Sequence, residues 1–209
     1  MKKLILASAS PRRASLLRLL DIPFEIVPSN VTEDFDAPLP PAEHVVEIAK
    51  RKTRTVANGV SNAIVLGADT VVALGNDILE KPRDSKHAVS MLTRLSGKTH
   101  RVYTGLVLID ADTEHIMTDV AITDVTMRDL SREDIDCYVA TSEPLDKAGA
   151  YGIQGRASIF IKSISGCFYN VVGLPLTNFW SLYHKFTGQS PWSLIPNTVG
   201  ATDLISPYA

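Results

Sequence analysis

The apolar run at residues 63–68, Ala-Ile-Val-Leu-Gly-Ala, constrains the fold of this chain more than any other feature. It does not alternate between polar and apolar residues, which is typical of a strand covered on both faces in an α/β protein. The run ends at Asp69 and Thr70. Because ligands in open α/β sheets bind beyond the carboxyl ends of strands, Asp69 is a candidate site residue. A cap on the following turn is the alternative, but an apolar run resumes directly at residues 71–73.

A second strand is predicted at residues 4–7, and it leads directly into the start of a helix. Ser10 suits the N-cap and Pro11 suits the first helical position. Arg12 and Arg13 then place two guanidinium groups at the positive end of the helix dipole, where acidic residues are ordinarily preferred. A phosphate would compensate this repulsion and match the forked donors. Two solvated arginines on a surface turn are the alternative.

The composition argues against several classes of protein. With 209 residues, 45% of them hydrophobic, the chain can bury one substantial core or two closely joined lobes. Its formal net charge of -2 argues against nucleic acid as a partner. No apolar run reaches the length of a membrane span, and Arg12 and Arg13 interrupt the candidate export signal. Cys137 and Cys167 form neither a disulfide framework nor a zinc motif. We therefore expect a cytoplasmic protein that binds neither nucleic acid nor membrane.

Three further charged residues are candidates for an anion-binding site. Lys52 interrupts the apolar stripe of a helix predicted at residues 41–56, where an ammonium group must be paired or reach solvent. Lys81 follows the end of a predicted strand. Glu33 lies in a polar, proline-containing loop at residues 30–41, which can bring carboxylates to a site. Taken alone, each of these residues has an ordinary explanation as a solvated side chain.

The remaining patterns predict a chain in which helices and strands are mixed. Helices are expected at residues 10–20, 41–56, 85–95, 131–140 and 175–186, and strands at residues 4–7, 24–28, 63–68, 102–109, 116–127 and 159–164. Residues 146–155 form a loop whose glycines permit close approach to a ligand, and Gln154 offers an amide donor and acceptor there. A mobile surface loop is the alternative. Residues 170–175 are expected to form a turn. We expect one domain of two lobes at residues 1–188 and an irregular tail at residues 189–209.

These charged residues together suit a nucleoside triphosphate with magnesium. Cations would neutralise the triphosphate, and carboxylates would hold a hard divalent ion that keeps several waters. One carboxylate could also orient an attacking water. The cations are Arg12, Arg13, Lys52 and Lys81, and the carboxylates are Glu33 and Asp69.

The chain resembles the Maf family of nucleotide pyrophosphatases in several segments that occur in order along most of its length. The matching segments are Ser8-Ala9-Ser10-Pro11-Arg12-Arg13, Gly67-Ala68-Asp69-Thr70, Lys81-Pro82, Leu95-Ser96-Gly97-Lys98-Thr99-His100, Val102-Tyr103-Thr104-Gly105, Asp146-Lys147-Ala148-Gly149-Ala150-Tyr151-Gly152-Ile153-Gln154-Gly155 and Val172-Gly173-Leu174-Pro175. The resemblance implies a Maf/ITPase-like α/β fold, with an elongated mixed sheet flanked by helices and two lobes around a central cleft.

The resemblance also implies hydrolysis of a nucleoside triphosphate to the monophosphate and pyrophosphate. Asp69 matches the family's proton acceptor. Arg12, Thr70 and Gln154 match specificity positions of the branch that acts on dTTP and UTP, and modified pyrimidine nucleotides are further candidate substrates. The Gln154 amide can accept from a pyrimidine N3–H and donate to the adjacent carbonyl, a pattern that thymine and uracil share. Ser8, Arg12, Arg13, Lys52 and Lys81 are expected to bind the substrate.

A divalent metal cation is the expected cofactor, held by Asp69 and Glu33. Mg²⁺ is the first expectation, and Mn²⁺ and Co²⁺ are alternatives. The residues leave open whether Asp69 acts as a base or chiefly as a metal ligand. Members of the family are often dimeric, so a homodimer is expected. The alternative function is a nucleotide-binding regulator of cell division with little hydrolysis.

Overall fold

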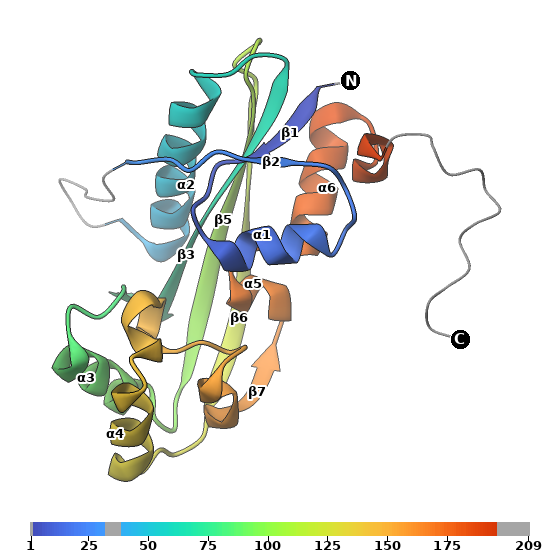
Figure 1. Cartoon of the computed structure of the whole chain (residues 1–209). Coiled ribbons are helices and arrows are strands. Elements are labelled where there is room, and N and C mark those ends of the chain that lie inside the picture. The colour runs from blue at the N-terminus through green and yellow to red at the C-terminus, as the bar shows by residue number, and fades with distance from the viewer. Residues whose placement is uncertain (1, 32–38, 196–209) are drawn as a thin grey trace, which may run out of the picture.

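The computed structural model describes residues 2–31 and 39–195, so Glu33 lies outside the described residues. Within them, a seven-stranded mixed sheet runs the length of the molecule in the order β2-β1-β3-β5-β6-β7, with β4 paired to β3 (Figure 1). Strand β1 pairs in parallel with β2 and β3, and the other pairs are antiparallel. The strands are β1 (Lys3–Leu6), β2 (Glu25–Ile26), β3 (Ala63–Leu74), β4 (Asp77–Leu79), β5 (Thr99–Asp110), β6 (Ile116–Met127) and β7 (Ile161–Ser165).

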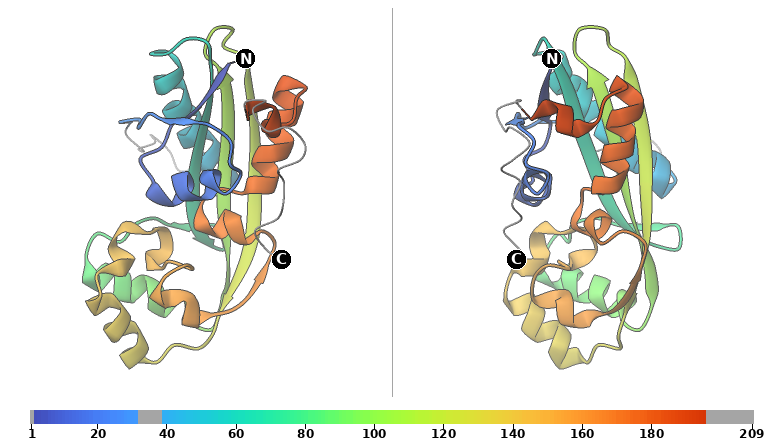
Figure 2. Two further views of the ribbon diagram at one scale, coloured as in Figure 1. Left: turned by 45° about the vertical axis from the view of Figure 1, so that its right-hand side comes forward. Right: turned by 90° about the vertical axis from the view of Figure 1, so that its right-hand side faces the viewer.

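Helices flank the sheet and form two lobes that the long strands β3, β5 and β6 join (Figures 1 and 2). One lobe contains α1, α2 and α6, and the other contains α3, α4 and several short 3-10 turns. The predicted elongated α/β fold is confirmed. None of the helices in the described part of the chain is long and apolar enough to span a membrane. The helices are α1 (Pro11–Arg18), α2 (Pro41–Ala57), α3 (Ser85–Leu95), α4 (Arg132–Ala140), α5 (Phe168–Val172) and α6 (Leu176–Thr187).

Helix α2 lies close against one face of β3 and β5 because both strands carry a glycine beneath it. A Cβ on Gly67 would collide with the Thr53 hydroxyl, and a Cβ on Gly105 would lie 2.6 Å from the main chain of Val45. The apolar stripe predicted for this helix is buried, with Val45 and Ile48 at 0% exposure. This close packing brings the polar side chains of α2 within reach of strand β3.

One edge of β3 is unpaired over five residues. Strand β1 pairs with Ala63 to Leu66, and β4 pairs with Val72 to Leu74. Residues 67–71 therefore have no strand partner on this edge within the described residues. Because side chains alternate along a strand, Asp69 points to the α2 face of the sheet and Thr70 to the opposite face. The open edge leaves space for a ligand beside both residues.

The position of Asp69 differs from the prediction. Strand β3 continues through Asp69 to Leu74, so this carboxylate lies within the strand and not beyond its carboxyl end. The strand continues because Val71 and Val72 are both buried, one on each face of the sheet. It is the parallel neighbour β1 that ends beside the open edge, at Leu6. The space for a ligand that was expected beside Asp69 is therefore present, and it arises because β1 ends there.

Three other segments differ from the predicted elements. The predicted turn at residues 170–175 begins inside helix α5, because the Asn170 side chain is fully buried against β5 and β6. The strand predicted at residues 159–164 begins only at Ile161, after the 3-10 helix Arg156–Phe160. In the segment predicted to be irregular, Pro191–Leu194 form a 3-10 turn.

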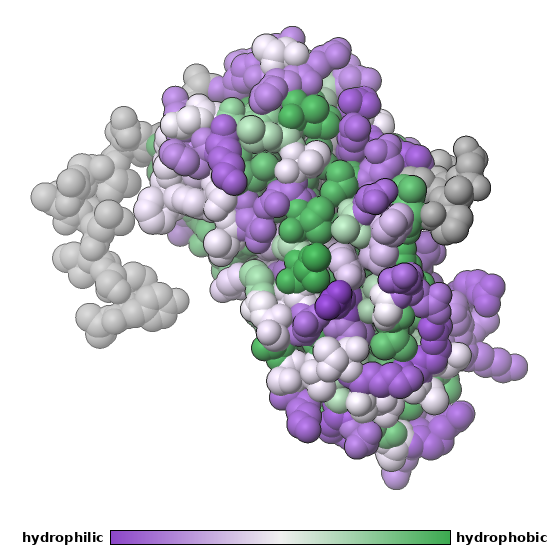
Figure 3. Space-filling view, turned by 180° about the vertical axis from the view of Figure 1, so that it is seen from behind, coloured by the Kyte–Doolittle hydropathy of each residue, from purple (hydrophilic) through white to green (hydrophobic). Residues whose placement is uncertain are grey.

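Apolar side chains also remain on the outer surface. Figure 3 shows the molecule from behind, where apolar side chains gather in a band down the middle of the face. On β6, Ile122 is 50% exposed. Val120 borders a groove beside α2, together with Leu39 and Val46. The expected homodimer stays a prediction.

Candidate functional site

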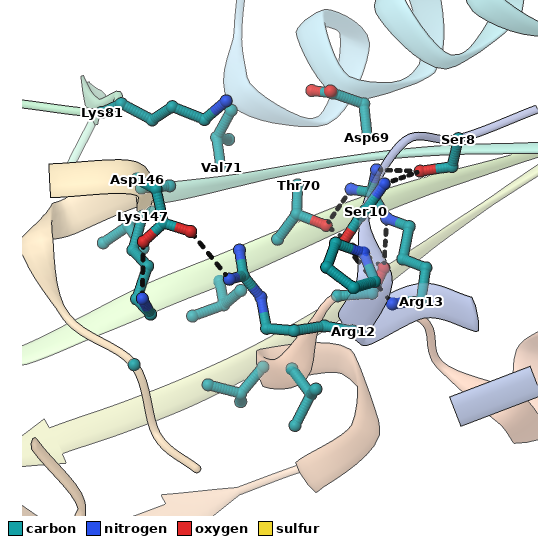
Figure 4. A pocket seen from close by; sticks show the side chains of 18 of the residues that line it. Ser8, Ser10, Arg12, Arg13, Asp69, Thr70, Val71, Lys81, Asp146 and Lys147 are labelled. Atoms are coloured by element: carbon teal, nitrogen blue, oxygen red, sulfur yellow. Dashed lines mark hydrogen bonds and ion pairs between the residues drawn. The ribbon is translucent and has the colours of Figure 1, made fainter. Parts of the chain in front are cut away.

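A cavity of about 510 Å³ lies along the open edge of β3, and residues from both lobes line it (Figure 4). A volume of this size suits a small-molecule ligand. Among the described residues, five cationic and three anionic side chains line the cavity, a surplus of two positive charges in a chain of net charge -2. The cavity therefore favours an anionic ligand. The charged residues are Arg12, Arg13, Lys52, Lys81, Lys147, Asp69, Glu80 and Asp146.

Asp69 forms an ion pair with Lys52 on the α2 face of β3. The Lys52 Nζ and Asp69 Oδ1 atoms are 2.7 Å apart, and the two side chains are only 13% and 10% exposed. The lysine on the apolar stripe of α2 is thus paired across the close helix–strand contact. Within the described residues, Asp69 Oδ2 makes no hydrogen bond. This oxygen can therefore serve a ligand or a water molecule.

Hydroxyl groups order the turn between β1 and α1. The Ser8 hydroxyl accepts a hydrogen bond from the Ser10 N–H at 3.2 Å, and the Ser10 hydroxyl caps α1 by accepting from the Arg13 N–H at 3.5 Å. Pro11 occupies the first turn of the helix. The predicted helix start is confirmed, and residues 8–13 line the cavity.

Arg13 is held on the sheet face opposite Asp69. Its Nε donates to the Gly173 carbonyl at 2.8 Å, and its Nη2 donates to the Thr70 hydroxyl at 3.0 Å. Its Nη1 donates to the Ser8 hydroxyl at 3.3 Å. Three acceptors from separate segments therefore fix the plane of the guanidinium group. Asp69 and Arg13 approach the open edge of β3 from its two faces and line the same cavity.

Arg12 reaches across the cavity to the second lobe. Its Nη1 lies 3.2 Å from Asp146 Oδ2, and the Lys147 ammonium lies 2.6 Å from the other oxygen of that carboxylate. Burial acts to raise the pKa of Asp146, but hydrogen bonds from Lys147 and Arg12 outweigh it and leave the pKa below its ordinary value. The Asp146 side chain is 66% exposed, so its pair with Arg12 is a weak surface ion pair. A phosphate group can replace this carboxylate.

Lys81 and Gln154 line the cavity with exposed side chains. The antiparallel strand β4 returns the chain alongside β3 and ends just before Lys81. In Figure 4 the Lys81 side chain points toward Asp69. Gln154 lies on the wall that the second lobe contributes, next to Gly155. Neither side chain forms a hydrogen bond within the described residues, so both can turn toward a ligand.

The structure adds residues to the site that the sequence patterns did not single out. Asp146 and Lys147 begin the glycine-containing loop, and their place in that motif was the signal that could have identified them. Glu80 precedes Lys81 and also lines the cavity. Tyr151 lies on the cavity wall, where its hydroxyl is 2.8 Å from His100 Nε2. Burial lowers the pKa of His100 to about 4, so this ring is neutral at neutral pH.

Asp69 is the described residue best placed to contact a divalent cation. Mg²⁺ is usually bound by one or two carboxylates together with waters and substrate phosphates. Asp69 Oδ2 fits that role, and Glu80 is a second carboxylate on the cavity wall. In residues 2–31 and 39–195, no group of three or more His, Cys, Asp or Glu side chains is suited to hold a metal. The described donors thus fit an ion that is also bound by phosphate.

Comparison with known proteins places the chain in a protein family. Residues 3–186 match the family of Maf-like proteins. A dTTP/UTP pyrophosphatase from Photorhabdus laumondii is 49% identical over 187 residues, covering 89% of this chain and 95% of the relative. A dTTP/UTP pyrophosphatase from Bacillus mycoides is 52% identical over 176 residues, covering 84% and 91%. A solved HAM1 protein from Coxiella burnetii has a TM-score of 0.46 at 14% identity, over 76% of this chain and 91% of that chain.

Proposed function

The chain belongs to the family of Maf-like proteins, and we propose that it hydrolyses dTTP and UTP to the nucleoside monophosphate and pyrophosphate. One observation carries this proposal: the Lys52–Asp69 pair lies at the open edge of β3, inside a cavity with a surplus of positive charge. A triphosphate supplies the negative charge that such a cavity favours. Relatives about half identical to this chain are named dTTP/UTP pyrophosphatases, which supports the choice of substrate.

In this proposal the cations bind the triphosphate from several sides of the cavity. Arg13 approaches from one face of β3 and Lys52 from the other. Lys81 reaches in from the end of β4, and Arg12 exchanges its pair with Asp146 for a phosphate oxygen. The hydroxyl of Ser8, in the turn between β1 and α1, is the remaining group proposed to bind the phosphates. These groups stabilise the negative charge that develops on the leaving pyrophosphate.

Asp69 is the general base that accepts a proton from the attacking water in this mechanism. Lys52 holds Oδ1 at 2.7 Å, which leaves Oδ2 to accept a proton as water attacks the α-phosphorus. The bond between the α-phosphorus and the bridging oxygen to the β-phosphorus breaks, and pyrophosphate leaves. General base assistance of this kind contributes about 10²–10⁴-fold in rate. Electrostatic stabilisation and in-line positioning supply the larger share.

A divalent cation, Mg²⁺ first and Mn²⁺ or Co²⁺ as alternatives, is part of the proposal. Asp69 is the described residue that would hold it, and Glu33 stays a predicted ligand outside the described residues. When bound, such an ion withdraws charge from the phosphate oxygens. The metal-ligand role and the general-base role both need Oδ2, because Lys52 holds Oδ1, so the two roles are alternatives for this carboxylate.

Gln154 is proposed to select the base. Its exposed amide lies on the wall of the second lobe, where it can accept from N3–H and donate to a carbonyl of uracil or thymine. Cytosine presents the opposite pattern at N3, so discrimination against it requires the Gln154 amide to be held in one orientation when the nucleotide is bound. Arg12 and Thr70 are the other proposed specificity residues, and both line the cavity.

A panel of nucleoside triphosphates with Mg²⁺ tests the proposed function. Pyrophosphate and orthophosphate are measured separately for dTTP, UTP, CTP, ATP and GTP. Release of pyrophosphate from dTTP and UTP above the other nucleotides is the expected result. Orthophosphate alone would indicate cleavage of the terminal phosphate and overturn the proposal. Binding of dTTP or UTP without a product would favour the nucleotide-binding regulator instead.

A further inference from the structure

Two threonine hydroxyls form a partly buried contact at the edge of the cavity. Thr70 on β3 and Thr104 on β5 are direct partners in the strand register, and their hydroxyl oxygens are 2.9 Å apart. Thr104 is fully buried and does not line the cavity. Its hydroxyl lies 3.3 Å from the main-chain carbonyl of Asn170 in α5. On the other side, the Thr70 hydroxyl lies 3.0 Å from Nη2 of Arg13. These contacts connect a cavity cation to the interior.

The chemistry of the two end groups fixes the direction of these hydrogen bonds. A guanidinium group only donates, and a carbonyl oxygen only accepts. Thr104 must therefore donate to the Asn170 carbonyl, since that carbonyl has no hydrogen to give. The hydrogen between the two hydroxyls must then come from Thr70. Only this arrangement places one hydrogen in each of the three contacts.

This direction determines what Thr70 can offer. Its single hydroxyl hydrogen points into the protein, toward Thr104, and its oxygen accepts from Arg13. The alternative acceptor for that hydrogen is the Gly173 carbonyl at 3.5 Å, which also belongs to the protein and already accepts from Arg13 Nε. Thr70 therefore has no hydrogen to donate to a substrate, and its hydrogen bond with Arg13 links it to the binding of phosphate.

We propose that Thr104 is a positioning residue that orients the Thr70 hydroxyl and thereby fixes the Arg13 guanidinium for binding phosphate. This inference rests on the proposed function for its ligand, a triphosphate, and extends the site to a residue that touches no ligand. Buried hydrogen-bond networks of this kind stiffen the groups at their ends. The Arg13 guanidinium is then oriented for phosphate before the ligand binds, which lowers the entropic cost of binding.

Replacing the buried hydroxyl tests this inference. Thr104→Val keeps the shape of the side chain. The Asn170 carbonyl still accepts a hydrogen bond from the Gly173 N–H at 3.0 Å, so the hydrogen bond that ends helix α5 is retained. Thr104→Ala avoids any clash with Thr70, and Thr104→Ser restores the hydroxyl. The control is Thr99→Val, because Thr99 also pairs its hydroxyl with a threonine on β6, Thr126, at 2.8 Å; this pair is exposed, and Thr99 does not line the cavity.

The readouts are the affinity for inorganic pyrophosphate with Mg²⁺ by calorimetry, the KM and kcat for UTP, and the melting temperature. We expect Thr104→Val and Thr104→Ala to weaken pyrophosphate binding and raise KM about 5-fold, the equivalent of one hydrogen bond. The change in kcat is expected to be smaller. Thr104→Ser and Thr99→Val are expected to stay within about two-fold of the wild type, a smaller effect than the loss of one hydrogen bond. In an Arg13→Ala background, Thr104→Val should have no further effect.

Unchanged pyrophosphate affinity in Thr104→Val and Thr104→Ala would overturn the inference. So would a full effect of Thr104→Val in the Arg13→Ala background, because Thr104 would then act elsewhere. Failure of the wild type to bind pyrophosphate would also overturn it, since Arg13 would not be a phosphate ligand. A wild type that binds pyrophosphate but does not hydrolyse UTP would overturn the proposed function alone.

Discussion

The Lys52–Asp69 pair yields a prediction in which stability and activity separate. Its charged atoms are 2.7 Å apart, which corresponds to a gross attraction of about 6 kcal/mol at an effective dielectric constant of about 20. The cost of taking two ions out of water offsets most of this attraction. Deleting one partner of a buried pair costs about 3–5 kcal/mol in a dry interior, because the other charge loses this attraction after both have been taken out of water. Because this pair borders the cavity, we expect a smaller loss.

The surrounding charges make the two deletions unequal. Among the described residues the cavity has a surplus of two positive charges, which Asp69→Asn raises and Lys52→Met lowers. Both replacements approximate the shape of the original side chain. We expect Asp69→Asn to lower the free energy of unfolding by about 2–3 kcal/mol and Lys52→Met to lower it by about 1 kcal/mol. The double variant should recover to within about 1 kcal/mol of the wild type.

Urea unfolding followed by circular dichroism measures these stabilities, and pyrophosphate release from UTP measures activity. Asp69→Asn and the double variant are both expected to lose at least about 10²-fold in kcat, so activity does not recover with stability. A larger stability loss for Lys52→Met than for Asp69→Asn would refute the charge reasoning. A correctly folded Asp69→Asn variant with wild-type turnover would refute the role of the carboxylate.

Three further predictions concern the second lobe. Asp146→Asn removes the ion pair with Arg12, so the KM for UTP should fall about 1.5- to 5-fold, which corresponds to the free energy of a surface ion pair. The control is Asp77→Asn, which breaks a surface ion pair away from the cavity and should leave the KM unchanged. Gln154→Ala should raise the KM for UTP and dTTP about tenfold while inhibition by inorganic pyrophosphate stays unchanged. Burial lowers the pKa of His100 from 6.5 to about 4. As the pH falls, His100 is therefore protonated in the unfolded chain before it is protonated in the folded chain. The free energy of unfolding should fall as the pH drops from about 6.5 toward 4, by up to about 1.4 kcal/mol per pH unit. Urea midpoints at pH 7 and pH 5 should show a smaller decrease in His100→Gln.

Local signals in the sequence were sufficient for the first helix and for the family. Ser10, Pro11 and the two arginines predicted a helix start at an anion site, and the structure places these residues on the cavity. Capping depends on neighbouring residues, so it can be recognised from sequence alone. The ordered motifs predicted membership of the Maf family, and the match over residues 3–186 confirms it.

Features that depend on distant pairing could not be predicted in this way. The open edge of β3 lies between the last residue paired with β1 and the first residue paired with β4. This register cannot be predicted from residues that are close together in the sequence. The sequence therefore predicted a strand end at Asp69 where the strand continues to Leu74. The partner of Lys52 and the contact between Thr70 and Thr104 likewise join residues far apart in the chain. A sequence pattern can indicate that Lys52 needs a partner, but only the fold identifies Asp69.

The most direct test of the central claim is to hydrolyse UTP in water enriched in ¹⁸O and to locate the label by mass spectrometry. If water attacks the α-phosphorus beside Asp69, we predict that the label enters UMP and that the pyrophosphate is unlabelled. Label in the pyrophosphate, or release of orthophosphate in its place, would contradict the mechanism. It would show that the cavity directs water to a different phosphorus atom.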